Sequence, residues 1–215
     1  MPKINLVIWD WNGTLQDDFD HIYGCGVQRI FREFNLPCPT VDEYRREVTN
    51  DFMRSFYWPR GIPSNVTADD LNKIMFEGFK EKGAPAPAFP DALAAVYETR
   101  RRGAACALIS AYASAKLAEA VKRHDFTALF YEVKGDVEEK TVEFSRLIFE
   151  AGSDPAEVAC VGDTVEDAEA AAAVGALPVI CPRGFHPRER IEALRERIPS
   201  LVIVDDLAAV PRLIG

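Results

Sequence analysis

The chain has 215 residues, of which 48% are hydrophobic and 27% charged, enough apolar material for a medium α/β domain or a core with a smaller insertion. Its formal net charge of −9 argues against a protein that binds the backbone of nucleic acids, because such proteins present a basic surface. No apolar stretch resembles a secretion signal or reaches membrane-spanning length, and five cysteines without close pairing do not indicate a disulfide framework. We therefore expect a cytoplasmic chain that binds neither nucleic acid nor membrane.

The first predicted element is a buried strand over residues 4–9, a short β-branched run that ends at Asp10. Between residues 18 and 83 the apolar residues follow helical spacing instead. The helical stripes are Val27, Ile30, Phe31 and Phe34; Tyr44, Val48, Phe52 and Phe56; and Leu71, Ile74, Met75 and Phe79. A stiff proline-rich connector over residues 83–90 follows them and marks a domain boundary.

After the connector, predicted strands and helices alternate to the end of the chain. We expect further strands at residues 104–109, 129–133, 158–161, 177–181 and 201–204. The intervening helices include one with Leu93, Val96 and Tyr97 on its apolar face, one over about 114–123, and one that carries Phe144, Leu147, Ile148 and Ala151.

This order predicts an α/β fold, a doubly wound parallel sheet (a Rossmann-like core) with an α-helical cap inserted after the first strand. The expected divisions are residues 1–16 for the first strand and its loop, 17–84 for the cap, and 85–215 for the remainder of the core.

Ligands of doubly wound sheets bind at the carboxyl ends of the strands. In this chain those ends carry Asp10, Ser110, the region 134–140 and Asp163. Asp10 directly follows the first strand, where a carboxylate can attack phosphorus or carbon and form a covalent intermediate. Taken alone, the segment fits a simple turn with local hydrogen-bond acceptors equally well.

A pair of acids strengthens the functional interpretation. Asp163 closes a predicted strand, and Asp167 lies four residues later in the first turn of a predicted helix, so both side chains face one side. Beside Asp10 they would repel one another unless a cation joined them, and such oxygen ligands select a hard divalent ion, usually Mg²⁺ where a substrate phosphate is present. The alternative, in which Asp163 is an N-cap and Asp167 complements the helix dipole, explains either residue but not why both follow the end of a strand parallel to the one that bears Asp10.

Three further positions are candidates for binding a phosphoryl group. Ser110 ends the second strand of the core, where its hydroxyl and the backbone N–H of Ala111 can hold a phosphoryl oxygen. Lys140 begins an amphipathic helix and can neutralise both the nucleophile and the transferring group, with Lys134 as a nearby competitor. Arg60 is a candidate for contacting substrate from the cap, although a solvated arginine is the simpler interpretation.

Together these segments resemble the haloacid dehalogenase-like hydrolase superfamily. The resemblance rests on Asp10-Trp-Asn-Gly-Thr-Leu, Ser110, Lys140 and Gly162-Asp-Thr-Val-Glu-Asp, in this order. The stretch from Pro90 to Ser110 also looks like that of phosphoglycolate-phosphatase-like members, and the helical insertion like their cap.

The resemblance implies a hydrolase in which Asp10 attacks phosphorus and water then hydrolyses the aspartyl phosphate. Mg²⁺ would be held by Asp10, the backbone carbonyl of Asn12 and Asp163, with Asp167 ligating directly or through water. The expected partner is a small phosphorylated metabolite, and the oligomeric state stays open.

Asn12 departs from the family pattern, which places a second aspartate there as general acid and base. An amide cannot transfer a proton, and such help is worth about 10²–10⁴-fold in rate. Three interpretations follow. The protein is a slow phosphatase or one whose leaving group needs little protonation, a different carboxylate such as Asp17 or one from the cap supplies the proton, or the protein binds a phosphorylated ligand without turnover. Because Asn12 precedes Gly13, deamidation to aspartate is a further hypothesis.

Two other reactions fit less well. A metal-free 2-haloacid dehalogenase also uses an aspartyl nucleophile but leaves the pair of Asp163 and Asp167 without a role. A phosphonate hydrolase would need a Schiff-base lysine from the cap, for which the candidates are Lys73, Lys80 and Lys82.

Overall fold

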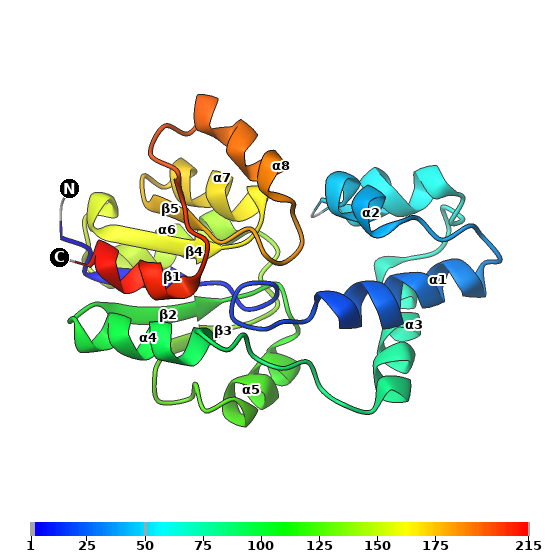
Figure 1. The fold of residues 1–215 in the computed structure, drawn as a ribbon, viewed down its shortest axis with the longest axis horizontal. Coiled ribbons are helices and arrows are strands. Elements are labelled where there is room, and N and C mark those ends of the chain that lie inside the picture. The colour runs from blue at the N-terminus through cyan, green and yellow to red at the C-terminus, as the bar shows by residue number, and fades with distance from the viewer. Residues whose placement is uncertain (1–2, 50, 215) are drawn as a thin grey trace. The chain divides into compact units, whose positions relative to one another are not determined.

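The computed structural model describes residues 3–49 and 51–214. The chain divides into two compact units, one made of Met1–Asp17 with Pro87–Gly215 and the other of Asp18–Ala86 (Figure 1). The role of residues 17–84 as a substrate-binding cap stays a prediction. Within the described residues, no helix is long and apolar enough to cross a membrane.

The first unit contains a parallel sheet in the order β3-β2-β1-β4-β5-β6. Its strands are β1 (Leu6–Trp9), β2 (Ala105–Ile109), β3 (Glu132–Lys134), β4 (Val158–Gly162), β5 (Leu177–Ile180) and β6 (Val202–Ile203). The chain runs outward from β1 in one direction and then returns to β4 on its other side. This order confirms the predicted doubly wound, Rossmann-like core.

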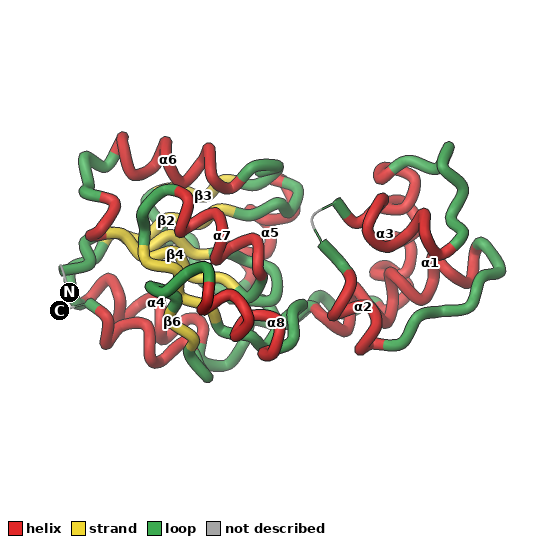
Figure 2. The backbone as a smooth tube through the Cα atoms, turned by 90° about the horizontal axis from the view of Figure 1, so that it is seen from above, coloured by secondary structure: helices red, strands yellow, loops and turns green. Residues whose placement is uncertain are grey.

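Helices cover both faces of this sheet (Figure 2). They are α4 (Ala92–Arg101), α5 (Ser114–Arg123), α6 (Lys140–Glu150), α7 (Val165–Ala173) and α8 (Arg188–Glu192), with 3-10 segments at Pro155–Glu157, Ala193–Glu196 and Leu207–Leu213. Val7 and Trp9 pack against α4, α5 and the last 3-10 segment, whereas Leu6 and Ile8 pack against α6 and α7. Because side chains alternate along a strand, Asp10 follows on the face of α6 and α7.

The second unit is helical. It contains a π-helical segment (His21–Val27) that runs into α1 (Gln28–Glu33), then α2 (Val41–Glu47), a π-helical turn (Met53–Tyr57), a 3-10 turn (Trp58–Arg60) and α3 (Ala68–Lys82). Capping boxes begin two of these helices, with Thr40 and Glu43 at α2, and Thr67 and Asp70 at α3. The predicted stripe from Tyr44 to Phe56 is not one helix, because Val48 adopts an extended backbone after α2.

Two further predictions from periodicity were wrong in detail. On α4, Leu93 and Tyr97 are 40% and 60% exposed, and the buried face consists of Ala92, Ala95, Val96 and Thr99. Because alanine is small, this face of α4 can pack closely on the sheet. A prediction based on the size and hydropathy of Leu93 and Tyr97 therefore chose the wrong face of the helix. The strand expected at 129–133 begins later, at Glu132, because Leu129 and Phe130 turn inward onto the core beside Phe126.

Candidate active site

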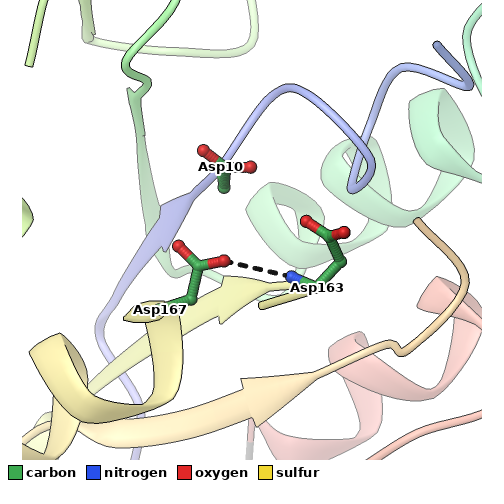
Figure 3. Close-up of side chains that lie close together, drawn as sticks. All are labelled: Asp10, Asp163 and Asp167. Atoms are coloured by element: carbon green, nitrogen blue, oxygen red, sulfur yellow. Dashed lines mark hydrogen bonds between the residues drawn. The ribbon is translucent and has the colours of Figure 1, made fainter. Parts of the chain in front are cut away.

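The site lies at the carboxyl ends of β1 and β4, where the strand order reverses (Figure 3). Asp10 follows the last residue of β1, and its backbone N–H donates to the carbonyl of Val161 over 2.9 Å. Asp163 follows the last residue of β4, and Asp167 stands in the first turn of α7. This junction is the usual ligand-binding position of a doubly wound sheet.

Three carboxylates meet there and are almost fully buried. Asp10, Asp163 and Asp167 are 7%, 0% and 2% exposed, and one oxygen of each lies within 4.8 Å of the others. The ammonium of Lys140 lies 2.7 Å from Asp10 Oδ1 and 2.5 Å from Asp167 Oδ1. Among the described residues, Lys140 is the cation that pairs with this cluster, so an excess of negative charge remains when all three carboxyls are ionised.

The sequence favoured Lys140 for this position over its nearby competitor Lys134. Lys134 instead pairs with Glu143 at 2.6 Å, and its side chain is 41% exposed. Lys140 is the first residue of α6, on the sheet face that Asp10 follows, so its side chain reaches the carboxylates. The structure thus favours Lys140.

Asp167 does two things at once. Its Oδ2 accepts from the Thr164 hydroxyl at 2.6 Å, the Thr164 N–H at 3.0 Å and the Asp163 N–H at 3.2 Å. Thr164, not Asp163, is therefore the N-cap of α7, in a capping box with Asp167. Since Oδ1 bonds Lys140, Asp167 is held as a supporting group beside the two strand-end carboxylates.

Asp163 is oriented by groups that sequence reasoning missed. The backbone N–H of Phe185 donates to Asp163 Oδ2 over 2.6 Å. The buried Thr14 hydroxyl lies 3.3 Å from Asp163 Oδ1 and 3.4 Å from Asp10 Oδ2, between the two carboxylates. A threonine inside the first motif was a visible signal, whereas a backbone donor in the loop after β5 leaves none in the sequence.

Glycines make room for this arrangement. Gly13 has a φ of +71°, and a Cβ there would stand 2.5 Å from Asp163 Oδ2. A Cβ on Gly184 would likewise collide with Asp163 Oδ2 and with the backbone of Gly13. Both positions therefore require a residue without a side chain, because the two loops pack directly against the carboxylate.

The charges perturb one another. Burial raises the pKa of Asp10 to about 6 although the ammonium of Lys140 opposes the shift. Burial, together with the charges of Asp167 and Asp10, raises the pKa of Asp163 well above its ordinary value. Burial also acts on Asp167, but Lys140 and Thr164 outweigh it and keep the pKa of that carboxyl low.

A hard divalent cation fits this set. The donors are carboxylate oxygens, and the unbalanced negative charge at Asp10 and Asp163 is what a cation would neutralise. Mg²⁺ at this position, predicted from the three acids, is therefore chemically compatible with the residues present.

The predicted phosphate-binding residues take different positions. Ser110 is 1% exposed at the end of β2, and its hydroxyl donates to Asn12 Oδ1 over 3.3 Å while accepting from the Tyr112 N–H at 3.1 Å. Ala111 follows in the exposed loop before α5. The end of β2 therefore lies beside the loop that follows β1, as the sequence suggested.

Arg60 lies in the second unit, Asp18–Ala86. Its guanidinium pairs with Glu47 at 2.6 Å and donates to the backbone carbonyl of Phe56. The guanidinium carbon also lies 4.0 Å from the centre of the Phe56 ring. These contacts hold the helical unit together, and substrate binding by Arg60 stays a prediction.

A further link joins the loop after β1 to the core. Arg183, in the loop after β5, pairs with Asp91 at 2.9 Å and donates to the backbone carbonyl of Thr14 at 3.1 Å. Its guanidinium also covers the ring of Phe89 at 3.8 Å. Asp91 accepts in turn from the N–H of Leu207, so one arginine joins four separate segments.

Replacing Arg183 with methionine should lower the free energy of unfolding by about 1–3 kcal/mol, because two charge-assisted hydrogen bonds are lost from a mostly buried position. Arg188→Met is the matched control, since its guanidinium pairs with the exposed Asp205 and should contribute less than about 1 kcal/mol. Urea denaturation of the two variants measures the difference. Equal effects would contradict the role of Arg183 as a link.

Lys140→Met should lower the free energy of unfolding by about 3–5 kcal/mol without added metal, because it leaves Asp10 and Asp167 buried without their cation. A divalent cation should restore part of this loss by replacing the missing positive charge. Lys134→Met, which removes a half-exposed pair, should cost less than about 1 kcal/mol. Urea denaturation with and without Mg²⁺ tests both variants, and a cation-insensitive loss in Lys140→Met would contradict the electrostatic explanation.

Comparison with known proteins gives the same family as the sequence motifs. The family model described as haloacid dehalogenase-like hydrolase matches residues 4–175. No curated protein matches the chain.

Solved structures share the fold across the whole chain. A predicted phosphoglycolate phosphatase from Haemophilus somnus superposes with a TM-score of 0.79, at 17% identity over 100% of both chains. A haloacid dehalogenase-like family hydrolase from Streptococcus pneumoniae gives 0.75 at 18% identity, again over 100% of both chains. CbbY from Rhodobacter sphaeroides, in complex with phosphate, gives 0.71 at 16% identity over 96% of each chain.

The family match covers the first strand, the helical insertion and the core through α7, and it includes all four sequence motifs. The chain therefore belongs to the haloacid dehalogenase-like hydrolase family.

Proposed function

We propose that this hydrolase is a Mg²⁺-dependent phosphatase that cleaves a small phosphorylated metabolite in the cytoplasm through an aspartyl-phosphate intermediate. The observation that carries the proposal is the buried cluster of Asp10, Asp163 and Asp167 with Lys140, at the strand-order reversal of the sheet. Similar proteins support the substrate class, because Rhodobacter sphaeroides CbbY has been crystallised with phosphate and with xylulose 1,5-bisphosphate.

Asp10 would be the nucleophile. It lies at the end of a buried strand, and Lys140 and Thr14 restrict its carboxylate from two sides. Attack on phosphorus forms the bond from Asp10 to phosphorus and breaks the bond to the leaving oxygen. Water then hydrolyses the aspartyl phosphate and returns the carboxylate.

Lys140, which pairs with Asp10, would also bind the phosphoryl group of the substrate. The transferring phosphoryl oxygens carry negative charge that a fixed ammonium stabilises. Ser110, beside Asn12 at the end of β2, would hold a phosphoryl oxygen together with the N–H of Ala111. These groups would orient the phosphorus for attack in line with the leaving group.

Mg²⁺ would be held by Asp10, Asp163 and the backbone carbonyl of Asn12, with Asp167 as a direct or supporting ligand. The bound cation would neutralise the carboxylates and the incoming phosphate dianion and so allow them to approach. The Phe185 N–H and the Thr14 hydroxyl contact the two carboxylate oxygens of Asp163 and fix its orientation, which supports a role as metal ligand.

The contacts do not favour the two other reactions. Lys73, Lys80 and Lys82 are exposed on α3, and the first two pair with Asp70 and Glu77 of the same helix. A Schiff-base lysine requires a desolvated amine, which these positions do not provide. A metal-free dehalogenase has no use for the buried acid cluster.

Deamidation of Asn12 is disfavoured as a way to regain the family aspartate. That reaction requires the Gly13 nitrogen to attack the side-chain amide of Asn12. The Gly13 N–H instead donates to the carbonyl of Gln16 over 3.0 Å in a buried turn. We expect peptide mass spectrometry of active protein to find intact Asn12.

The proposed function is tested by phosphate release from a panel that includes sugar phosphates, phosphoglycolate, aryl phosphates and acetyl phosphate, with Mg²⁺ and with chelator. We expect phosphate release with Mg²⁺ and none with chelator. Metal-dependent binding of phosphorylated compounds without any release would favour the binding-only alternative instead.

A further inference from the structure

The proton requirement of the reaction is set by the leaving group. When the bond between phosphorus and the bridging oxygen breaks, the electron pair stays on that oxygen. An alkoxide is too basic to leave unprotonated at neutral pH, so alkyl phosphates need an acid. A carboxylate or an acidic phenolate is stable as an anion and leaves without one.

The residue two positions after Asp10 does not supply that proton. Tyr112 N–H donates to the Ser110 oxygen, and the Ser110 hydroxyl donates to Asn12 Oδ1. Asn12 thus uses its side-chain carbonyl as an acceptor toward Ser110. An amide N–H₂ group can hydrogen-bond to a leaving oxygen, but its protons stay on nitrogen.

The neighbouring polar groups of the core are committed to other contacts. Lys140 bridges Asp10 and Asp167, and Asp167 also caps α7. Asp163 accepts from Phe185 N–H. We expect these groups to stabilise charge and fix orientation at the reacting phosphorus, and not to transfer a proton to the leaving oxygen.

On the basis of the proposed phosphatase reaction, we infer that Asn12 restricts this protein to phosphoryl donors with weakly basic leaving groups, of which acyl phosphates are the metabolite class. In the first step Asp10 takes the phosphoryl group and the acyl carboxylate leaves as an anion. In the second, water adds to phosphorus, Asp10 leaves as a carboxylate, and both protons of that water remain on the released dihydrogen phosphate. Charge and protons balance in each step without a general acid.

The second step tolerates the amide better than the first step with an alkyl ester. Aspartyl phosphate is itself an acyl phosphate, so its leaving group is a carboxylate. A loose transition state also demands little deprotonation of the attacking water. The selectivity therefore arises in the first step, when the substrate bond breaks. For acyl phosphates this first step is fast, so hydrolysis of the aspartyl phosphate becomes the slower of the two steps.

The test is a leaving-group series, with acetyl phosphate, phenyl phosphates of graded acidity and alkyl phosphates, measured as kcat/KM with Mg²⁺. For the unmodified protein we expect kcat/KM to fall about 10²–10⁴-fold from acetyl phosphate to alkyl phosphates, the size of the missing acid. Acetyl phosphate and the most acidic aryl phosphates should give a burst of product followed by a slower steady rate.

Asn12→Asp should flatten the series, because kcat/KM for alkyl phosphates should rise about 10²–10⁴-fold relative to kcat/KM for acetyl phosphate. Asn12→Ala should keep the steep dependence, because it also lacks a proton to donate. A purely structural role of Asn12 would change all substrates alike in both variants.

A flat series in the unmodified protein would overturn the inference without touching the proposed function, because it would show that another group donates the proton. Asp17→Asn would then steepen the series if Asp17, which is exposed, were that donor. Failure of every compound, acetyl phosphate included, would overturn both the inference and the proposed function. The series in the unmodified protein decides between these outcomes even if a variant does not fold.

Discussion

Asp10→Asn should reduce phosphate release by on the order of 10⁴-fold or more, because the amide is a poor nucleophile and the covalent step is lost. The fold should survive. Lys140 keeps its partner Asp167, and the substitution removes one of three crowded negative charges. Steady-state phosphate release and circular dichroism of the variant measure both quantities.

Trapping of the intermediate makes this prediction specific. Rapid acid quenching of the unmodified protein with acetyl phosphate should give a peptide that carries phosphate on Asp10, and Asp10→Asn should give none. Glu119→Gln, an identical change of charge on the exposed side of α5, should leave turnover and labelling intact. Undiminished release by Asp10→Asn would refute the nucleophile assignment.

A divalent cation should stabilise the folded protein, because it neutralises carboxylates that burial and mutual repulsion oppose. At a Mg²⁺ concentration about 100-fold above its Kd, the gain should be about 2.7 kcal/mol. For a chain of this size that corresponds to an increase in Tm of about 5–10 °C. Thermal unfolding in Mg²⁺ and in chelator measures the shift.

Asp163→Asn should abolish this response and leave the metal-free protein at least as stable as the unmodified one. The amide oxygen can still accept from Phe185 N–H, while the repulsion from Asp10 and Asp167 is relieved by up to about 3 kcal/mol. The Tm of the variant should therefore be insensitive to Mg²⁺. An undiminished cation response in Asp163→Asn would place the cation elsewhere.

Much of the fold followed from local patterns. Three of these patterns are the β-branched run before Asp10, the alternation of strands and helices, and the proline-rich connector. Each is formed by residues that are neighbours in sequence, so each can be interpreted without knowledge of tertiary contacts. The buried face of α4 could not be predicted from such a pattern. The burial of Ala92 and Ala95 rather than Leu93 and Tyr97 depends on how closely the helix approaches the sheet.

The candidate site divides in the same way. The sequence shows which acids follow strand ends, and parallel strands bring such ends to one edge of the sheet. The pairing of β1 with β4, which the sequence alone does not determine, then makes Asp10 and Asp163 neighbours. The sequence also determined Asn12, whose amide cannot transfer a proton in any fold, and thereby the question of the leaving group.

Tertiary structure alone decided how these groups are held. The donation from Phe185 N–H to Asp163, the position of Thr14 between two carboxylates and the link from Arg183 to Asp91 join residues that are far apart in the chain or use backbone atoms common to all residues. No side-chain pattern encodes such contacts, because they depend on where the loop after β5 packs. The sequence therefore determined the chemistry available at the strand ends, and packing decided the orientation in which it is presented.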